Sequence, residues 1–430
     1  MKRPSTARDR EAIYRGLWVA AGAVAVVFGL RQYMYFKGVV PNGAIGEGGD
    51  FYAYLIAARD IASGHSPYDL QLVHRGYGYA YSPFVALVFL PFRTLSMRLL
   101  WRTWISLSIV ALVICCGLFT RYASPSLRRW HRPVFFAFVA LTALDFGPTR
   151  WELYNGQTDT FVLLLLVVSS LVAERDRQVL SGALMGVGAI VKSWPGLVVL
   201  TLFRRRLVGR GRAVVGFVSA ALVALVLVVI VGGTSGLAKF LRVTLEGSSQ
   251  PDPSYSVWGT PKVLFSASRL AKPLIVSGVL RDVSTLALVI AVASLLFLAL
   301  RWSDSSLLSY WNIVGGTVLL LPVSHLAYTL YLLPILWIWM FRALAAPTFE
   351  VTSFAVTVVM LLWWLFMYRY GWVEWPSESS IHYMSPFFVD FAVFATSVLS
   401  DHRRRRLFDA GSRLDTDIDR PLNAQKEADA

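Results

Sequence analysis

Five ionisable side chains lie at or inside apolar stretches of this sequence. They are Asp50, Arg150, Glu152, Asp159 and Lys192. A carboxylate in such a place can take a proton from a hydroxyl, and a cation there can stabilise a developing negative charge. Charged groups near hydrocarbon are costly unless they pair or line a cavity. We therefore take these five residues as candidate site residues.

Asp50 follows a Gly-Gly pair and precedes Phe51-Tyr52, just after the first apolar segment. It can act as a general base on a substrate that arrives at the membrane boundary. It can also be the N-cap of an amphipathic helix over Phe51–Ile61. The two roles are compatible.

The other charged candidates also have a structural interpretation. Arg150 can pair with Glu152 or with Asp159 and hold helices together, or it can face a ligand beside Gln157. Lys192 can extend to the interface or stabilise an anionic ligand.

Aromatic residues and one histidine complete the candidates. Tyr255 and Trp258 can stack on a sugar ring or lie in an aromatic belt at the membrane surface. His325 can bind a phosphate, donate a proton or be structural. Tyr81 begins an apolar run in a Tyr-Ser-Pro-Phe string, a pattern that alone indicates a structural role. No metal-ligand spacing occurs, so we expect neither a metal nor another cofactor.

The composition indicates that membrane-spanning helices position these residues. The 430 residues are 56% hydrophobic and only 16% charged, whereas soluble domains have about 25% charged residues. A soluble fold could not bury that much apolar surface. The formal net charge of +15 has no soluble basic domain to carry it, so we expect contact with membrane lipids and no nucleic-acid partner.

The apolar runs predict an all-α integral membrane protein with about 11–13 helical segments and membrane-associated outer loops. The run over Gly182–Phe203 is interrupted at Lys192-Ser193-Trp194-Pro195, which predicts two short helices that form a hairpin or a re-entrant pair. The other candidate spans are Tyr14–Leu30, Trp104–Phe119, Pro133–Leu144, Thr160–Ala173, Ala213–Val231, Ser284–Leu300, Leu307–Leu321, Tyr328–Phe341, Val351–Met367 and Pro386–Leu399.

The basic clusters predict the orientation, because arginine and lysine accumulate on the cytoplasmic side. All clusters fall on one side only if the chain turns back near Lys192. We expect a basic cytoplasmic segment at 1–15, a transmembrane catalytic domain at 16–400 and a disordered cytoplasmic tail at 401–430. The first segment is expected to be an uncleaved anchor. Outer loops are expected at about 41–103, 232–282 and 368–385, on the extracytoplasmic face of a multi-pass plasma-membrane protein.

An ordered series of short motifs resembles glycosyltransferase family 87. The series comprises Asp50-Phe51-Tyr52-Ala53-Tyr54, Ser63-Gly64-His65-Ser66-Pro67-Tyr68-Asp69, Tyr81-Ser82-Pro83-Phe84, Gly156-Gln157-Thr158-Asp159, Ser181-Gly182-Ala183-Leu184-Met185-Gly186, Val191-Lys192-Ser193-Trp194-Pro195 and Tyr255-Ser256-Val257-Trp258-Gly259. The resemblance covers about residues 45–340. The order of the motifs carries it, since none of them is specific alone.

The resemblance implies a multi-span glycosyltransferase of the GT-C type, similar to polyprenol-phosphate-mannose-dependent mannosyltransferases of the phosphatidylinositol mannoside type and to lipid-linked arabinofuranosyltransferases. The implied donor is a polyprenyl monophosphate sugar, most simply a mannose donor, and the acceptor is a lipid or a glycan. The implied base is Asp50. We expect Lys192, Arg150 and His325 at the donor phosphate, and Gln157, Asp159, Tyr255, Trp258 and Tyr81 at the substrate.

The sequence departs from the family pattern at residues 321–328. The family often has Ser-Pro-x-Ser-Trp-x-His-His, and the paired histidine positions hold Ala327 and Tyr328 here. His325 stands at the tryptophan position and either substitutes for the pair or leaves the phosphate to other groups. Asp159 also replaces the usual asparagine.

Three other functions stay open at this point. An arabinofuranosyl donor would keep the reaction class and change the sugar. A lipid-linked sugar transporter or flippase would also use broken helices and intramembrane charges, although no internal repeat is found. A scaffold without catalysis would leave the order of the polar motifs without a reason.

Overall fold

The computed structural model is helical throughout the residues that it describes, which are 7–41, 48–68, 79–192, 194–204, 209–247, 254–268, 270–302, 306–346, 348–370 and 379–428. Within those ranges no strand occurs. Six helices there are long and apolar enough to cross a membrane, and five shorter apolar helices accompany them. The predicted all-α, multi-span fold is confirmed, and these eleven helices agree with the expected number.

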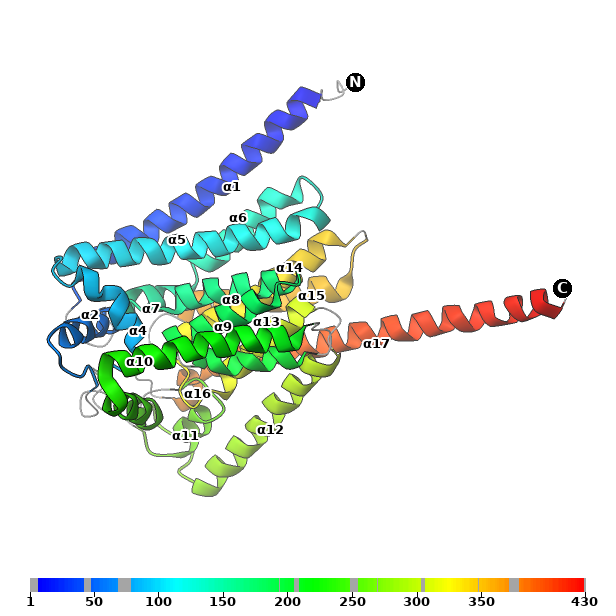
Figure 1. Ribbon diagram of the computed structural model, residues 1–430. Helices are drawn as coiled ribbons and strands as arrows, with labels where there is room; N and C mark the ends of the chain where they lie inside the picture. Colours follow the sequence, from blue (N-terminus) through cyan, green and yellow to red (C-terminus); the bar gives the residue numbers. More distant parts are fainter. Residues whose placement is uncertain are drawn as a thin grey trace.

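Helices from the first third of the chain lie side by side along one edge of the molecule (Figure 1). They are α1 (Ala7–Phe36), α5 (Met97–Ala123) and α6 (His131–Leu144). Shorter helices cover the end of this layer, namely α2 (Gly49–Ala62), α4 (Pro83–Phe89) and η1 (Leu90–Phe92). The single turn η2 (Ser124–Ser126) follows α5 at the other end.

A short helix and a tight turn lead from this layer into the centre of the bundle. The helix α7 (Gly147–Asn155) ends at Gly156, which has a left-handed φ of 68°. A β-carbon there would lie 2.6 Å from the ring of Trp101, so this close turn requires glycine. The chain then enters α8 (Asp159–Ala173), whose first residue is a candidate site residue.

The segment around Lys192 forms the predicted hairpin. The helix α9 (Gln178–Val191) ends at Lys192, and the 3₁₀-helix η3 (Trp194–Phe203) returns beside it. The Thr201 hydroxyl lies 3.4 Å from the Met185 sulfur, and Gly196 lies beside Ala189, so the two segments are antiparallel. Ten 3₁₀ residues and fourteen α-helical residues both rise about 20 Å, so the chain returns to its starting level.

The next helix, α10 (Arg210–Gly247), runs parallel to α9 in very close contact. A β-carbon on Gly182 would lie 1.8 Å from the Ala213 carbonyl oxygen, and one on Gly216 would lie 2.0 Å from the Val179 carbonyl oxygen. These distances are shorter than any real contact, so only glycine lets the two backbones approach in this way.

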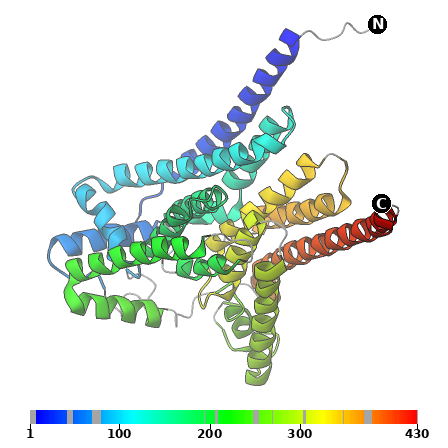
Figure 2. The same ribbon diagram turned by 45° about the vertical axis from the view of Figure 1, so that its right-hand side comes forward.

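The second half of the chain completes the bundle. Its elements are α11 (Gly259–Phe265), α12 (Gly278–Trp302), α13 (Ser306–Leu320), η4 (Leu326–Leu332), α14 (Leu333–Ala345), α15 (Val351–Tyr370), α16 (Ser380–Tyr383) and α17 (Ser385–Ala428). The apolar segment Leu326–Ala345, which comprises η4 and α14, is the most buried of the six long apolar helices. By contrast, α12 is largely exposed and angles away from the bundle in both views (Figures 1 and 2).

The basic clusters gather at the end of the bundle where both chain termini lie (Figure 1). Ion pairs join elements there: Arg129 with Glu11, Arg212 with Asp176, Arg342 with Asp401 and Arg404 with Glu350. The predicted return of the chain near Lys192 brings Arg212 to this end. The short helices α2, α4, α11 and α16 lie toward the opposite end.

Several expected boundaries differ from the structure. The interval 232–247 is helical, because α10 continues through its Gly-Gly pair, which costs only about 1 kcal/mol per glycine in helix propensity. The interval 97–103 already belongs to α5. After 401, α17 continues as one helix as far as Ala428, and the expected disorder of this tail stays a prediction. The loop parts 42–47, 69–78, 248–253, 269 and 371–378 lie outside the described residues.

Candidate active site

Asp50 lies in the first turn of α2 and is held by two side chains from other elements. Its Oδ1 accepts a hydrogen bond of 2.9 Å from the Tyr81 hydroxyl, and its Oδ2 accepts one of 2.8 Å from Gln157 Nε2. The carboxylate is partly exposed. The expected N-cap role is wrong, because Gly48 is the N-cap and makes no side-chain cap bond. Both oxygens instead face Tyr81 and Gln157, so Asp50 is oriented for a task outside its own helix.

Backbone contacts fix the start of α2 against α7. The N–H of Gly48 donates to the Tyr154 carbonyl over 2.8 Å, and Gly48 has a left-handed φ of 68°. Trp104 of α5 donates from Nε1 to the Gly156 carbonyl over 3.0 Å, directly before Gln157. The start of α2 is therefore held by α7, and the residue before Gln157 is held by α5.

The turn after α7 connects Asp50 with a buried ion pair. Gln157 bonds Asp50, and two residues later Asp159 Oδ2 lies 2.5 Å from the ammonium of Lys192. Asp159 is fully buried and Lys192 is 6% exposed, so each charge depends on the other. The Tyr331 hydroxyl also donates to Asp159 Oδ1 over 2.6 Å.

Lys192 reaches this place because α9 ends there in an extended residue. Ser82, next to Tyr81, donates from its hydroxyl to the Ile190 carbonyl over 2.5 Å. This bond ties the Asp50 side of the site to the end of α9. The expected alternative, in which Lys192 extends to the membrane interface, is wrong because Asp159 neutralises the ammonium inside the bundle.

Aromatic rings surround the Lys192 ammonium. It lies 4.4 Å from the centre of the Tyr328 ring, which is within cation–π distance. Trp194 packs on the rings of Tyr328 and Tyr331, with centroid distances of 5.7 and 4.6 Å. His325 is partly buried and stands edge-on to Tyr328 at 5.6 Å. The structure thus brings Lys192 and His325 to the same tyrosine.

Glu152 is a further buried carboxyl beside Asp159. Its Oε1 accepts a 3.2 Å bond from the Thr160 backbone N–H, while Oε2 has no hydrogen-bond partner among the described residues. Burial, and then the negative charge of Asp159, raise the pKa of Glu152 well above its usual value. The same two causes disfavour the ionised form of Glu152 beside the Lys192–Asp159 pair.

Tyr81 can donate its hydrogen bond to Asp50 over a wide range of pH. Burial, followed by the charge of Asp50, raises the pKa of the Tyr81 hydroxyl well above its usual value. The neutral hydroxyl therefore persists as a donor to the carboxylate. The ring of Tyr54 packs edge-on against Tyr81 at 5.0 Å and keeps it in place.

Arg150 does not join this site through either expected partner. Its guanidinium pairs with Asp145 over 2.6 Å and lies 4.6 Å from the centre of the Tyr368 ring. Arg31 of α1 pairs with the same carboxylate over 3.0 Å. The expected pairs with Glu152 or Asp159 are wrong, because residues two apart on a helix point to different faces and Glu152 turns toward α8.

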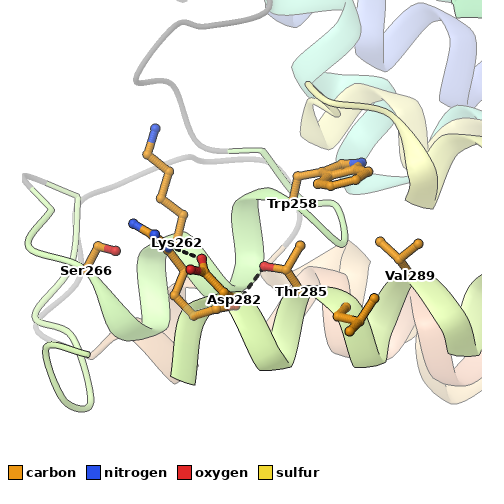
Figure 3. Close-up of a pocket in the computed structure, with 8 residues that line it drawn as sticks. Trp258, Lys262, Ser266, Asp282, Thr285 and Val289 are labelled. Carbon is orange, nitrogen blue, oxygen red and sulfur yellow. Dashed lines mark hydrogen bonds and ion pairs between the residues drawn. The ribbon is translucent and has the colours of Figure 1, made fainter. Parts of the chain in front are cut away.

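Tyr255 and Trp258 lie in one segment and face different surroundings. Tyr255 is buried, stacks on Tyr383 at 6.0 Å and donates its backbone N–H to the Ser324 carbonyl, next to His325. Trp258 is 47% exposed and donates from Nε1 to the Leu320 carbonyl. It lines a separate cavity of about 580 Å³ between α11 and α12 (Figure 3). No described contact brings either ring to Asp50.

Two residues of the buried network were not predicted. Tyr331 lies in an aromatic apolar run, where only its hydroxyl distinguishes it from core residues. Asp145 follows the apolar run of α6, and that position is the only sequence signal for it. Among the described residues, no group of three or more His, Cys, Asp or Glu side chains is placed to hold a metal ion.

A comparison with protein families finds a match over the part of the chain that holds most of these residues. The model of glycosyltransferase family 87 matches residues 79–324, which is more than half of the chain. No curated protein matches the sequence. The matched part contains Tyr81, Gln157, Asp159 and Lys192. His325 directly follows it, and Asp50 lies well before its first residue.

Proposed function

Because the chain belongs to glycosyltransferase family 87 and is a membrane glycosyltransferase, we propose that it transfers a hexose, in the first place mannose, from a polyprenyl monophosphate donor. The acceptor is a lipid or a glycan at the extracytoplasmic face of the plasma membrane. The observation that carries the proposal is the partly exposed carboxylate of Asp50, which accepts hydrogen bonds from Tyr81 and Gln157. Two positions after Gln157 in the sequence, Asp159 forms a buried ion pair with Lys192.

The reaction starts at the acceptor hydroxyl. Asp50 takes its proton while the oxygen attacks the anomeric carbon of the donor sugar. The bond from that carbon to the phosphate oxygen breaks, and polyprenyl phosphate leaves with the electron pair. One direct displacement inverts the anomeric centre and requires a single carboxylate, in contrast to the paired carboxylates of glycoside hydrolysis.

Tyr81 and Gln157 orient the base. Their hydrogen bonds occupy one direction at each Asp50 oxygen and leave further lone pairs for the acceptor proton. Both donors are fixed by buried neighbours, so the carboxylate is placed before substrate binds. This preorganisation is what a general base needs for efficient proton transfer.

The leaving phosphate gains negative charge, and nearby cations stabilise it. We propose Lys192 and His325 for this role, because both adjoin Tyr328. Asp159, which also accepts a hydrogen bond from Tyr331, holds the Lys192 ammonium in place. Arg150 is bonded to Asp145, so we assign it to support of α7.

The donor-phosphate side of the site differs from the family pattern. Ala327 and Tyr328 stand where the family often has two histidines, and Tyr328 faces Lys192. A changed group at the donor phosphate is compatible with a different donor, so arabinofuranosyl transfer is the second candidate. Metal independence belongs to both versions, since the proposed cations are side chains.

A transfer assay tests the proposal. Purified protein in lipid vesicles would receive radiolabelled polyprenyl-phosphate-mannose or polyprenyl-phosphate-arabinose with a membrane lipid extract as acceptor source. Labelled product from the mannose donor alone is the expected result. Product from the arabinose donor alone would replace mannose by arabinofuranose, and no product from either donor would overturn the proposed donor class.

A further inference from the structure

The cavity between α11 and α12 lies apart from Asp50 and combines charge with an apolar surface. Its wall includes Trp258, Lys262 and Arg281, and its floor is the first turns of α12 (Figure 3). The remaining lining residues are Ser266, Asp282, Thr285, Leu286 and Val289. Trp258 lies over α12 on the side of Val289, and Lys262 extends at the other end of the cavity.

Two cations at this cavity have donors available to an anion. Lys262 forms no ion pair with any described residue. Arg281 pairs with Asp282 through Nε over 2.8 Å, which leaves its two terminal nitrogens without a bond to the described part of the chain. The charges of Lys262, Arg281 and Asp282 leave the cavity with one excess positive charge. A phosphate between an ammonium and a guanidinium would receive charge-assisted hydrogen bonds from both.

Exposed cations alone bind a free anion weakly in water. This cavity, however, opens onto a stripe of exposed apolar side chains along α12. The stripe comprises Val279, Val283, Leu286, Ile290 and Phe297, spaced at three, four or seven residues. Such spacing places them on one face of the helix. The cavity therefore places a charged site next to an apolar surface. An amphiphilic ligand has the matching parts, a charged headgroup and an apolar chain.

The position of the cavity agrees with a membrane–water boundary. It lies at the first turn of a 25-residue apolar helix whose most apolar stretch is only 22% buried inside the protein. Trp258 is half-exposed beside it, as tryptophan is at such boundaries. A ligand whose phosphate meets Lys262 and Arg281 would place its chains along the exposed face of α12.

We propose that this cavity binds the phosphate headgroup of an anionic membrane phospholipid, whose acyl chains lie on the exposed stripe of α12. The site does not depend on the proposed sugar transfer. It also braces the active site: Trp258 donates to the Leu320 carbonyl, and the neighbouring Tyr255 and Val257 bond the backbone of Ser324 and Leu319. A lipid against Trp258 therefore supports the segment that leads to His325.

Native mass spectrometry of the full chain in detergent tests the proposal. The protein would be mixed with phosphatidylglycerol, which is anionic, or phosphatidylcholine, which has no net charge. The wild type is expected to retain phosphatidylglycerol in preference. The variant Lys262→Ala/Arg281→Ala is expected to lose about tenfold in that affinity, since each cation near the membrane surface contributes to anionic-lipid binding. The matched control is Lys272→Ala, an exposed lysine outside the cavity lining, which is expected to bind as the wild type does.

Two outcomes would overturn the lipid site. In one, the double variant retains phosphatidylglycerol as well as the wild type does. In the other, millimolar inorganic phosphate displaces the lipid, which would identify a site for free phosphate. Both variants change exposed side chains, and circular dichroism checks their fold. Should the double variant misfold, Lys262→Glu alone serves the same test, because a reversed charge repels the anionic headgroup.

Discussion

At the Lys192–Asp159 pair, structural and catalytic roles can be separated. Lys192→Ala leaves a fully buried Asp159 carboxylate without its cation, so we expect a loss of about 3–5 kcal/mol in the free energy of unfolding. Lys192→Met/Asp159→Leu removes both charges and should recover most of that stability while sugar transfer stays low. Thermal unfolding in detergent and the transfer assay measure the two effects.

The outcome for the double variant decides the role of Lys192. Transfer that recovers together with stability would mean that Lys192 only holds helices together and does not act on the donor phosphate. The Arg212–Asp176 ion pair offers a control, because both of its side chains are mostly exposed. Breaking that pair by Arg212→Ala should change stability little.

Tyr81 gives a pH prediction. The neutral hydroxyl donates to Asp50, and the raised pKa of Tyr81 keeps it neutral beyond the usual value of about 10. Ionisation of Tyr81 should therefore cause no loss of turnover between about pH 8 and about pH 10. Tyr81→Phe should lower kcat about tenfold across that range by loss of one charge-assisted bond.

Rates of the wild type and Tyr81→Phe at several pH values check this point. An alkaline decrease in the wild type that disappears in the phenylalanine variant would show that Tyr81 ionises in the working range. The carboxylate would then lack a permanent donor.

Individual residues were only partly predictable from the sequence. Asp50, Gln157, Asp159 and Lys192 stand out because charge and amide groups are scarce near apolar runs. Their partners depend on how helices pack: Arg31 reaches Asp145 across 114 positions, and Tyr331 reaches Asp159 across 172 positions. No local pattern contains that information.

The packing of α9 against α10 gives a prediction for an element. Gly216→Ala would place a β-carbon 2.0 Å from the backbone oxygen of Val179, which cannot move alone. We expect a loss of about 1–3 kcal/mol in the free energy of unfolding, the usual cost of overpacking. Gly211→Ala in the same helix meets no atom within 4 Å and should be neutral or slightly stabilising.

Thermal unfolding of the two alanine variants in one detergent makes this comparison. Equal unfolding temperatures for Gly216→Ala and Gly211→Ala would contradict the close approach of α9 and α10. The hairpin that turns at Lys192 would then have to be held by contacts other than those between α9 and α10.

The hairpin itself shows what a sequence reveals about an element. Pro195 and the sidedness of the arginine clusters predict a break and a return, and the structure has both. The 3₁₀ form of the returning segment was not predictable from these signals. The continuation of α10 to Gly247 was also missed, since a Gly-Gly pair weakens a helix without ending it.

The arrangement of the whole molecule predicts which regions face each side of the membrane. Ser63 at the end of α2 lies toward the Asp50 end, and Arg128 lies among the basic clusters; both are exposed. In intact cells that express single variants, a membrane-impermeant maleimide should label Ser63→Cys and leave Arg128→Cys unlabelled until the membrane is permeabilised. The native Cys115 and Cys116 are fully buried and should stay unlabelled in the parent protein.

Labelling of both positions from the outside would contradict the topology, and labelling of Arg128→Cys alone would invert it.

The sequence was most informative about the arrangement of the whole molecule. Low charge content and basic clusters indicate a multi-span protein with its termini on one side, because these properties sum over many residues. The relative tilt of α12, and hence the cavity beside it, depends on contacts that no single segment encodes.

The most direct test of the central claim is sugar transfer by the Asp50→Asn variant in lipid vesicles, with the donor that supports turnover by the wild type. Asparagine keeps the shape of the side chain and cannot take the acceptor proton, so we expect transfer to fall by about 10²–10⁴-fold while the protein stays folded. The control is Asp60→Asn, a carboxylate on the same helix that is expected to leave transfer unchanged. Transfer near the wild-type rate in folded Asp50→Asn protein would contradict the assignment of Asp50 as the base.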